Sequence, residues 1–280
     1  HNKIKNSEHV LLVPHKDPDG DALGSVTALM HILKQLNKKH SVFCATDADS
    51  QLNFLPYVEE LTTDEAVWEN PFDLVIIVDS GDLERAGMEK FVKNKKDNTT
   101  VINIDHHNDN THFGDLNLVI PSASSTTHIL YDLFKANNVE IDSQTATCLL
   151  TGLITDTGNF TNAATTVESL DIASDLVRKG GDIKMIKKLV FQDKSIDTLK
   201  LWGAALNEGK AALILKERDQ GKIKGSFRTT QDDIDVSKIA RKLGGGGHKK
   251  AAGFSIDGNM EEVLEKVWQA IEEHKNNENK

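Results

Sequence analysis

Near its amino terminus the chain carries three side chains of types that bind metal ions: His15, Asp19 and Asp21 fall within seven residues. The loop that holds them contains Pro18 and Gly20, and an irregular backbone lets neighbouring side chains converge instead of alternating between opposite faces. Imidazole and carboxylate together suit Mn, Fe or Zn better than Ca. The two aspartates could equally cap a following helix, because acidic residues stabilise helix amino termini. These residues by themselves leave both interpretations open.

Two apolar segments further along end in side chains of the same kinds. The run F-D-L-V-I-I-V-D-S (residues 72–80) ends in an aspartate and a serine, and T-T-V-I-N-I-D-H-H (residues 99–107) ends in an aspartate and two histidines. A single histidine there would more often be an ordinary core or surface residue. Two adjacent histidines after an aspartate, at the end of a predicted strand, make that alternative much weaker. The candidates are Asp79, Asp105, His106 and His107.

A last candidate, Asp156, follows a predicted helix in the sequence T-D-T-G. Gly158 could instead provide the left-handed cap of that helix, and both interpretations can hold at once. The potential ligands then exceed what one ion needs if water and substrate also bind. They suit two ions that share a bridging carboxylate, an arrangement typical of phosphoester hydrolysis. The six ligand candidates are His15, Asp19, Asp21, Asp79, His106 and Asp156.

Alternating strands and helices must position these side chains. Apolar runs predict strands over residues 9–14, 41–46, 72–80 and 99–107, and helical spacing predicts helices over 22–36, 124–137, 143–154, 166–179 and 184–207. Nearly continuous apolar strands indicate a parallel sheet with helices on both faces. Ligands of such sheets bind at the carboxyl ends of the strands, where the candidates lie. The fold class is therefore predicted to be α/β.

From Gly209 onward the pattern changes to a smaller α+β domain. Strands are predicted over residues 211–215, 222–228 and 251–256, with helices over 236–243 and 260–274. The predicted organisation is a catalytic domain over 1–183, a bridging helix or linker over 184–208 and a substrate-binding domain over 209–280. The bridging helix would run almost directly into Gly209. The family that the motifs described below resemble usually has more residues there, which implies either a trimmed domain or a missing mobile segment. We expect the second, visible as a chain break near Glu208.

The second domain carries a local excess of positive charge. Residues 216–250 hold ten basic and five acidic residues, a balance of +5 within a chain of net charge −10. A run of four glycines, residues 244–247, precedes a histidine, and bare backbone can approach a phosphate closely. A flexible link after a helix and a solvated charged surface are the alternatives. The candidate phosphate-binding residues are Arg228, Gly245, Gly246, Gly247 and His248.

The composition of the chain argues against some classes of binding partner and some cellular locations. The chain has 280 residues, 38% hydrophobic and 27% charged, and its net charge of −10 argues against binding long duplex DNA. Cys44 and Cys148 lack paired spacing, so we expect no disulfide and a reducing cytoplasm. No run of eighteen apolar residues is present, so we expect no membrane association. A homodimer is compatible with the sequence.

Taken in order, these motifs resemble those of the DHH phosphoesterase family. H-K-D-P-D-G-D-A-L-G-S, V-D-S, D-H-H and T-D-T-G resemble its four motifs, and S-F-R-T with G-G-G-G-H-K-K-A-A-G resembles the DHH-associated C-terminal domain. The resemblance implies two Mn²⁺ ions, with other divalent metals as alternatives. It assigns His15, Asp19 and Asp79 to one ion, and Asp21, Asp79, His106 and Asp156 to the other. Asp17 occupies a variable position of the first motif and is not counted.

The resemblance also implies roles outside the ligand set. Asp105 would orient the histidine pair, and His107 would lie by the reacting phosphate as a ligand or proton donor. Arg228 and His248 would hold a substrate phosphate from across an interdomain cleft. A short two-domain chain resembles the NrnA type, which hydrolyses short single-stranded RNA (nanoRNA) and 3′-phosphoadenosine 5′-phosphate (pAp). The alternatives are the DhhP type, acting on cyclic di-AMP or its linear product pApA, and a nucleotide-binding module without turnover.

Overall fold

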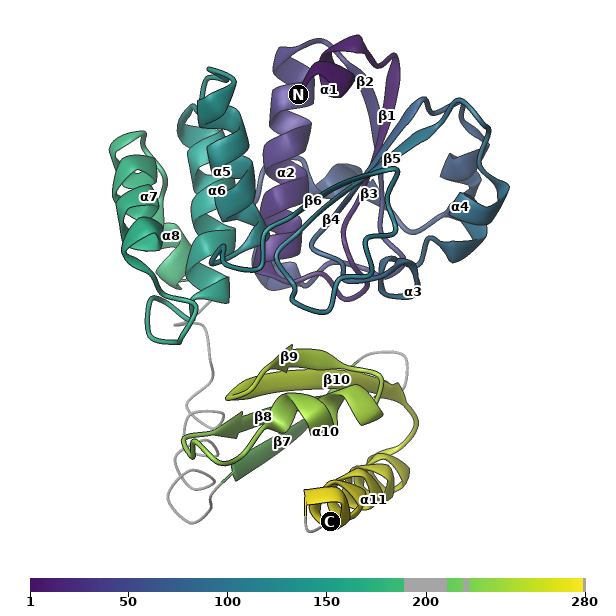
Figure 1. Cartoon of the computed structure of the whole chain (residues 1–280), viewed down its shortest axis with the longest axis vertical. Coiled ribbons are helices and arrows are strands. Elements are labelled where there is room, and N and C mark those ends of the chain that lie inside the picture. The colour runs from purple at the N-terminus through teal and green to yellow at the C-terminus, as the bar shows by residue number, and fades with distance from the viewer. Residues whose placement is uncertain (189–210, 219–221, 279–280) are drawn as a thin grey trace. The chain divides into compact units, whose positions relative to one another are not determined.

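The computed structural model describes residues 1–188, 211–218 and 222–278 (Figure 1). The chain divides into two compact units, His1–Asp193 and Lys194–Lys280. The predicted bridging helix over 184–207 falls mostly on residues 189–210, and the predicted break near Glu208 falls there too. Both lie outside the described residues, so the linker and the domain boundaries stay predictions.

The first unit is built on a parallel sheet of six strands in the order β3-β2-β1-β4-β5-β6. The strand order reverses direction between β1 and β4, the kind of position at which open α/β sheets bind ligands. The predicted parallel α/β fold is therefore confirmed. The strands are β1 (His9–Val13), β2 (Lys39–Phe43), β3 (Leu61–Thr62), β4 (Leu74–Val78), β5 (Thr100–Asp105) and β6 (Leu116–Val119).

Helices surround this sheet, and the long ones match the predicted segments within a few residues. The shorter ones were not predicted, because four to six residues give too little periodicity to detect. The α-helices are α1 (Asn2–Asn6), α2 (Gly20–Gln35), α3 (Leu83–Ala86), α4 (Glu89–Asn94), α5 (Thr126–Ala136), α6 (Ser143–Asp156), α7 (Val167–Arg178) and α8 (Ile183–Ile186). The 3₁₀ helices are η1 (Ser50–Leu52), η2 (Val58–Glu60) and η3 (Glu65–Glu69).

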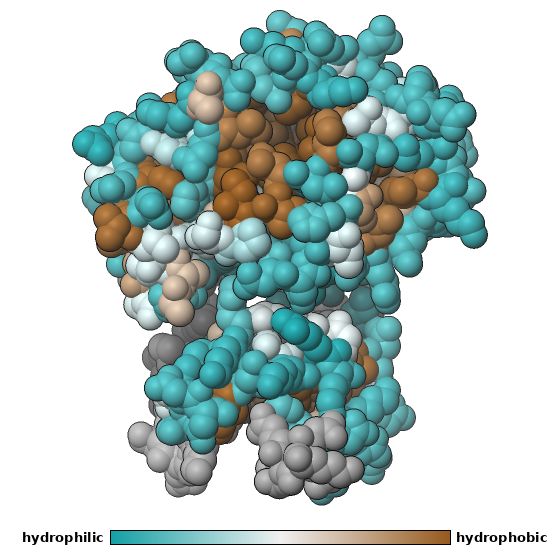
Figure 2. Space-filling model, in the orientation of Figure 1, coloured by the Kyte–Doolittle hydropathy of each residue, from teal (hydrophilic) through white to brown (hydrophobic). Residues whose placement is uncertain are grey.

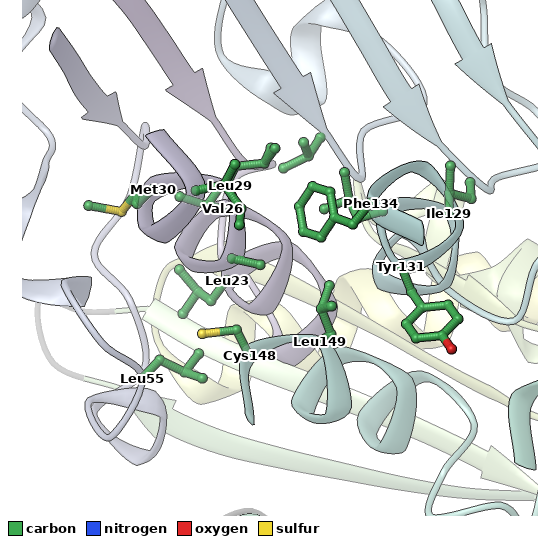
Figure 3. Packing of buried hydrophobic residues seen from close by; sticks show 14 of the residues in the cluster. Leu23, Val26, Leu29, Met30, Leu55, Ile129, Tyr131, Phe134, Cys148 and Leu149 are labelled. Carbon is green, nitrogen blue, oxygen red and sulfur yellow. The ribbon is translucent and has the colours of Figure 1, made fainter. Parts of the chain in front are cut away.

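Both faces of the sheet are covered, because alternate residues of its central strands enter two different cores. Leu12 and Ile76 pack with the helices α2, α5 and α6, whereas Leu11 and Val75 join a second cluster that includes Met88. Figure 3 shows the first of these cores, where side chains of α2, α5 and α6 interdigitate. A strand buried on both faces explains why β1 and β4 are continuous apolar runs.

The second unit is an antiparallel sheet in the order β7-β8-β10-β9 with two helices (Figure 1). Its core contains Phe227 and Phe254 from the sheet with Val236, Val263 and Val267 from the helices. The small α+β domain predicted from the sequence is confirmed. The elements are β7 (Ala211–Arg218), β8 (Lys222–Thr229), α10 (Val236–Lys242), β9 (Gly246–His248), β10 (Ala251–Asp257) and α11 (Met260–Glu278).

In the part of the chain that the structure describes, three strands were not predicted from the sequence. β3 has two residues and β6 is a four-residue edge strand, so both are too short to show a strand pattern. No strand was predicted for the glycine run, which is wrong for Gly246–His248, because this segment pairs with β10 as β9. Among the described residues, none of the helices has the length and hydropathy needed to span a bilayer.

Candidate metal centre

The structure brings the six predicted ligand residues together at the carboxyl ends of three adjacent strands. The loop after β1 supplies His15 and Asp19, the residue after β4 is Asp79, and His106 follows β5. Asp21 lies in the first turn of α2, and Asp156 is the last residue of α6. Their nitrogen and oxygen atoms form two groups of three, each with all atoms within 4.8 Å of one another, and a third such group of Asp79, His106 and His107 shares a residue with each.

The loop after β1 orients one imidazole and caps one helix. The His15 ring lies with Nδ1 2.7 Å from the Lys16 carbonyl oxygen, which leaves Nε2 facing the carboxylates. Nε2 is 3.8 Å from Asp19 Oδ1 and 3.5 Å from Asp79 Oδ2. Asp19 is also the N-cap of α2, where its Oδ1 accepts hydrogen bonds from Asp21 N and Ala22 N. The capping and ligand interpretations of this residue are therefore compatible.

Asp79 occupies the centre of the cluster in an unusual backbone conformation. Its φ is 57°, in the left-handed region, which costs a residue other than glycine about 1–3 kcal/mol. The side chain is buried and its two oxygens face different imidazoles. Oδ2 faces His15, whereas Oδ1 lies 3.6 Å from His106 Nε2. A carboxylate in this position can contact two ions at once.

Close packing of α2 against α6 brings Asp21 and Asp156 to the same histidine. Asp156 Oδ2 is 3.3 Å from His106 Nε2, and Asp21 Oδ2 is 3.9 Å from the same nitrogen. A Cβ atom at Gly152 of α6 would collide with Asp21 Oδ1 and with the side chain of Thr127. Glycine at this position thus lets α2 and α6 approach closely enough to bring both carboxylates to one histidine.

We expect Gly152→Ala to destabilise the first unit by about 1–3 kcal/mol, the usual cost of overpacking a tight interior. The displaced Asp21 should also weaken metal binding. Denaturant unfolding measures the first effect and calorimetric titration the second. The control is Gly81→Ala, because a Cβ at Gly81 would have its nearest neighbour, Asp109 Oδ1, at an ordinary contact distance of 3.8 Å. Equal stability of the two variants would show that the close helix contact is not needed.

The other two residues of the D-H-H triplet form a hydrogen-bonded pair. His107 Nδ1 lies 2.8 Å from Asp105 Oδ1, and Asn110 Nδ2 donates to Asp105 Oδ2 at 2.6 Å. Asp105 is fully buried, whereas the His107 side chain is 30% exposed. The aspartate therefore fixes the ring of a histidine that can reach a bound molecule.

Burial and neighbouring charges shift the pKa values of the side chains in the cluster. Burial alone would lower the pKa of His15, but the carboxylates of Asp19 and Asp79 raise it to about 10. Burial likewise opposes the charge of His106, yet Asp156, Asp79 and Asp21 raise its pKa to about 9. The pKa of Asp21 is raised by burial and by the nearby carboxylates of Asp79 and Asp156. A cluster of this kind favours a bound cation.

The spacing of the donor atoms fits divalent ions. Nitrogen–oxygen distances of 3.3–3.9 Å between the imidazoles and carboxylates exceed the usual hydrogen bond. Two donors that each lie about 2.0–2.2 Å from one ion are themselves separated by roughly 3.0–3.5 Å. Mixed imidazole and carboxylate donors suit Mn, Fe or Zn. The residues present therefore fit a divalent metal centre.

The predicted phosphate-binding residues of the second unit also lie together. Ala251 of β10 pairs with Arg228 on one side and with His248 on the other, so all three share one face of the sheet. Lys224 and Lys222 lie on that face too, at alternate positions of β8. The face opposite the core is therefore rich in positive charge.

The glycines have a second, structural explanation. Cβ atoms at Gly245 and Gly247 would collide with the backbone of β10, and Gly247 has a φ of 133°. β9 can therefore pair with β10 only when these positions lack side chains. Their contribution to phosphate binding stays a prediction.

Sequence reasoning missed three residues that contact the cluster. Thr126 and Thr127 at the start of α5 and Asn110 in the loop after β5 all hydrogen-bond to its aspartates. The signal for the first two was the run S-S-T-T at the start of a predicted helix, because these residue types cap helices. Asn110 had no comparable signal.

Two family models match the sequence. The DHH family, N-terminal domain, matches residues 9–153, and the DHHA1 domain matches residues 187–273. Together the two matches span most of the chain.

Similar proteins agree with these matches. The bifunctional oligoribonuclease and PAP phosphatase NrnA of Thermus thermophilus is 32% identical over 94% of this chain and 89% of its own length. The cyclic-di-AMP phosphodiesterase GdpP of Geobacillus thermodenitrificans is 25% identical over 97% of this chain and 48% of its own. An exopolyphosphatase-related protein from Bacteroides fragilis has a similar structure, with a TM-score of 0.80 and 25% identity over 98% of this chain and 94% of that one.

Proposed function

Because this chain belongs to the DHH family and carries a DHHA1 domain, we propose that it is a manganese-dependent phosphoesterase of short oligoribonucleotides and pAp. Family membership makes it a hydrolase of phosphoester bonds that depends on divalent metal ions. The substrates are proposed from its similarity to NrnA proteins over nearly the full length of both chains.

The observation that carries this proposal is Asp79, whose two carboxylate oxygens face two different histidines. His15, Asp19 and Asp79 would hold one ion. Asp21, Asp79, His106 and Asp156 would hold the other. When bound, two such ions supply a hydroxide at neutral pH and stabilise charge on phosphate oxygens.

His107 is proposed to act on the substrate directly. Its Nδ1 is held by Asp105, so Nε2 is the ring nitrogen that remains for the substrate. The partly exposed ring can bind a phosphate oxygen or donate a proton to the leaving oxygen. Asp105, itself fixed by Asn110, keeps the ring in one orientation.

Arg228 and His248 are proposed to bind a phosphate of the substrate, with the backbone of residues 245–247. Arg228→Ala should raise KM roughly 10–100-fold, because a charged hydrogen bond contributes about 1.5–3 kcal/mol. The kcat should change by less than about threefold if the residue only binds substrate. Steady-state kinetics on pAp measures both constants.

The matched control is Lys238→Ala, which removes one positive charge from the exposed surface of α10. We expect its kinetics to equal those of the unaltered protein. If Arg228→Ala behaved in the same way, the basic face would be ordinary solvated surface.

Substrate choice is tested by comparing pAp, a ribodinucleotide, pApA and cyclic di-AMP with Mn²⁺, each with and without chelator. Turnover of pAp and the dinucleotide that chelator abolishes is the expected result. A strong preference for pApA or cyclic di-AMP would favour the second candidate function, which the similarity to GdpP supports. Absence of turnover on all four would favour a binding module.

We also propose a homodimer formed through β6. This strand is one of the two edges of the sheet in the described residues, and an exposed edge can pair with another chain. Leu116, its first residue, is 47% exposed, and Ile120, which follows it, is 36% exposed. Figure 2 shows apolar side chains gathered over the part of the first unit where β6 lies. Light scattering should give twice the chain mass, and a monomer would contradict the proposal.

A cytoplasmic location is proposed with the same function. Cys44 and Cys148 are both buried and free, which fits a reducing compartment. Detection of the protein in a cell fraction other than cytosol would overturn this assignment.

A further inference from the structure

The first turn of α5 faces two carboxylates of the metal centre. Thr126 N donates to Asp21 Oδ2 at 2.6 Å, and Thr127 N donates to Asp21 Oδ1 at 2.9 Å. The hydroxyl of Thr126 donates to Asp79 Oδ1 at 3.0 Å. All of these residues are at most 2% exposed. One threonine therefore contacts two carboxylates that come from distant parts of the chain.

The bonds to Asp21 use groups that a helix leaves available. The first N–H groups of a helix have no acceptor within the helix, and their positive end attracts a carboxylate. Ser125 caps α5 through its hydroxyl, which accepts a hydrogen bond from His128 N at 3.0 Å and fixes the turn. Each oxygen of Asp21 accepts one N–H and retains a lone pair for an ion. The orientation of this carboxylate is thus set by backbone atoms.

The bond to Asp79 uses the side chain. Asp79 adopts a left-handed backbone conformation, so neighbouring groups must hold it in place. Its Oδ1, which receives the Thr126 hydroxyl, is the oxygen that faces His106, whereas Oδ2 faces His15. The hydroxyl thereby fixes the rotation of the Asp79 carboxylate between the two histidines.

We propose that Thr126 is a positioning residue that fixes Asp21 and Asp79 relative to each other and so preorganises the centre for two ions. This inference rests on the proposed function, since it takes both carboxylates as metal ligands. Thr126 contacts neither ion nor substrate in this scheme. Its backbone holds one ligand and its hydroxyl holds the other.

The test separates the hydroxyl from the rest of the residue. Thr126→Val keeps the shape and the backbone N–H but removes the donor to Asp79. Thr126→Ser keeps the donor. Loss of a group that orients a metal ligand typically weakens metal binding 10–100-fold, so we expect a loss of about that size in the valine variant. The serine variant should bind within about threefold of the unaltered protein, because its hydroxyl restores the bond to Asp79. Calorimetric titration with Mn²⁺ measures the affinity without any turnover.

The control is Thr151→Val in α6, which removes an equally buried hydroxyl. Thr151 Oγ1 donates to the Thr147 carbonyl at 2.8 Å, within the helix. We expect its Mn²⁺ affinity to be unchanged, and circular dichroism checks that each variant folds. Unaltered affinity in Thr126→Val, or equal losses in both valine variants, would overturn the inference while leaving the metal centre intact. If the unaltered protein bound no Mn²⁺, the proposed metal centre itself would fail.

Discussion

Replacing Asp79 with alanine is expected to lower kcat for pAp by about 10³ or more. The proposed bridge would be lost from both ion positions, and each ion contributes several kcal/mol to stabilising the transition state. A loss of about 4 kcal/mol corresponds to roughly a thousandfold lower rate. Single-turnover hydrolysis with Mn²⁺ measures the effect.

The control lies at the other end of the same strand. Asp73 precedes β4 and accepts hydrogen bonds from Glu8 N and His9 N, far in the fold from the carboxyl ends of the strands. Asp73→Ala should therefore keep its turnover. Retained turnover in Asp79→Ala would contradict the two-metal scheme. An Asp79→Ala variant that lost turnover yet still bound nucleotide would match the scheme. A parent protein that bound nucleotide but did not hydrolyse it would be a binding module.

The second large effect concerns stability. Asp21, Asp79 and Asp156 are gathered around His106, so a cation should stabilise the folded first unit strongly. At about 1,000 times its dissociation constant, a ligand stabilises the folded state by about 4 kcal/mol. For a unit of this size that raises Tm by roughly 8–16 °C. Calorimetric scans in Mn²⁺ and in chelator measure the difference.

The variant Asp156→Asn distinguishes stabilisation by the bound metal from the stability of the metal-free fold. Asp156 is the last residue of α6, and a carboxylate at a helix carboxyl end is opposed by the helix dipole. We expect this variant to have nearly the same Tm as the parent protein in chelator but a much smaller rise with Mn²⁺. A rise as large as that of the parent would exclude Asp156 from the metal centre.

Some strands and helices could be predicted from the sequence and others could not. β1 and β4 were predictable because a strand buried on both faces is apolar, and β5 because the middle of it, V-I-N-I, is mostly apolar. Polar residues follow at the carboxyl ends of all three. β6 and β9 were not, because an edge strand and a glycine-rich strand lack that pattern. The short helices α3 and α4 lack enough turns to show a period.

In the candidate site, too, some residues could be predicted from the sequence and others depend on packing. The amino-acid types and strand-end positions of His15, Asp79 and His106 predicted a metal centre before any geometry was available. Asp156 was a candidate by residue type, with a helix-end interpretation equally open, since a residue at the end of a helix can point anywhere until the helix is packed. Its approach to Asp21 depends on glycine at the contact between α2 and α6.

The α/β class, the chemistry of the ligands and the strand ends that carry them could all be predicted before the structure was known. These follow from local hydrophobic patterns and side-chain types, which do not depend on how the chain packs. The contacts of Thr126 with Asp21 and Asp79 became evident only in the folded chain. The same holds for the pairing of Ala251 with both Arg228 and His248. Such contacts arise when segments distant in the chain are brought together by packing and strand pairing, and no local pattern records them.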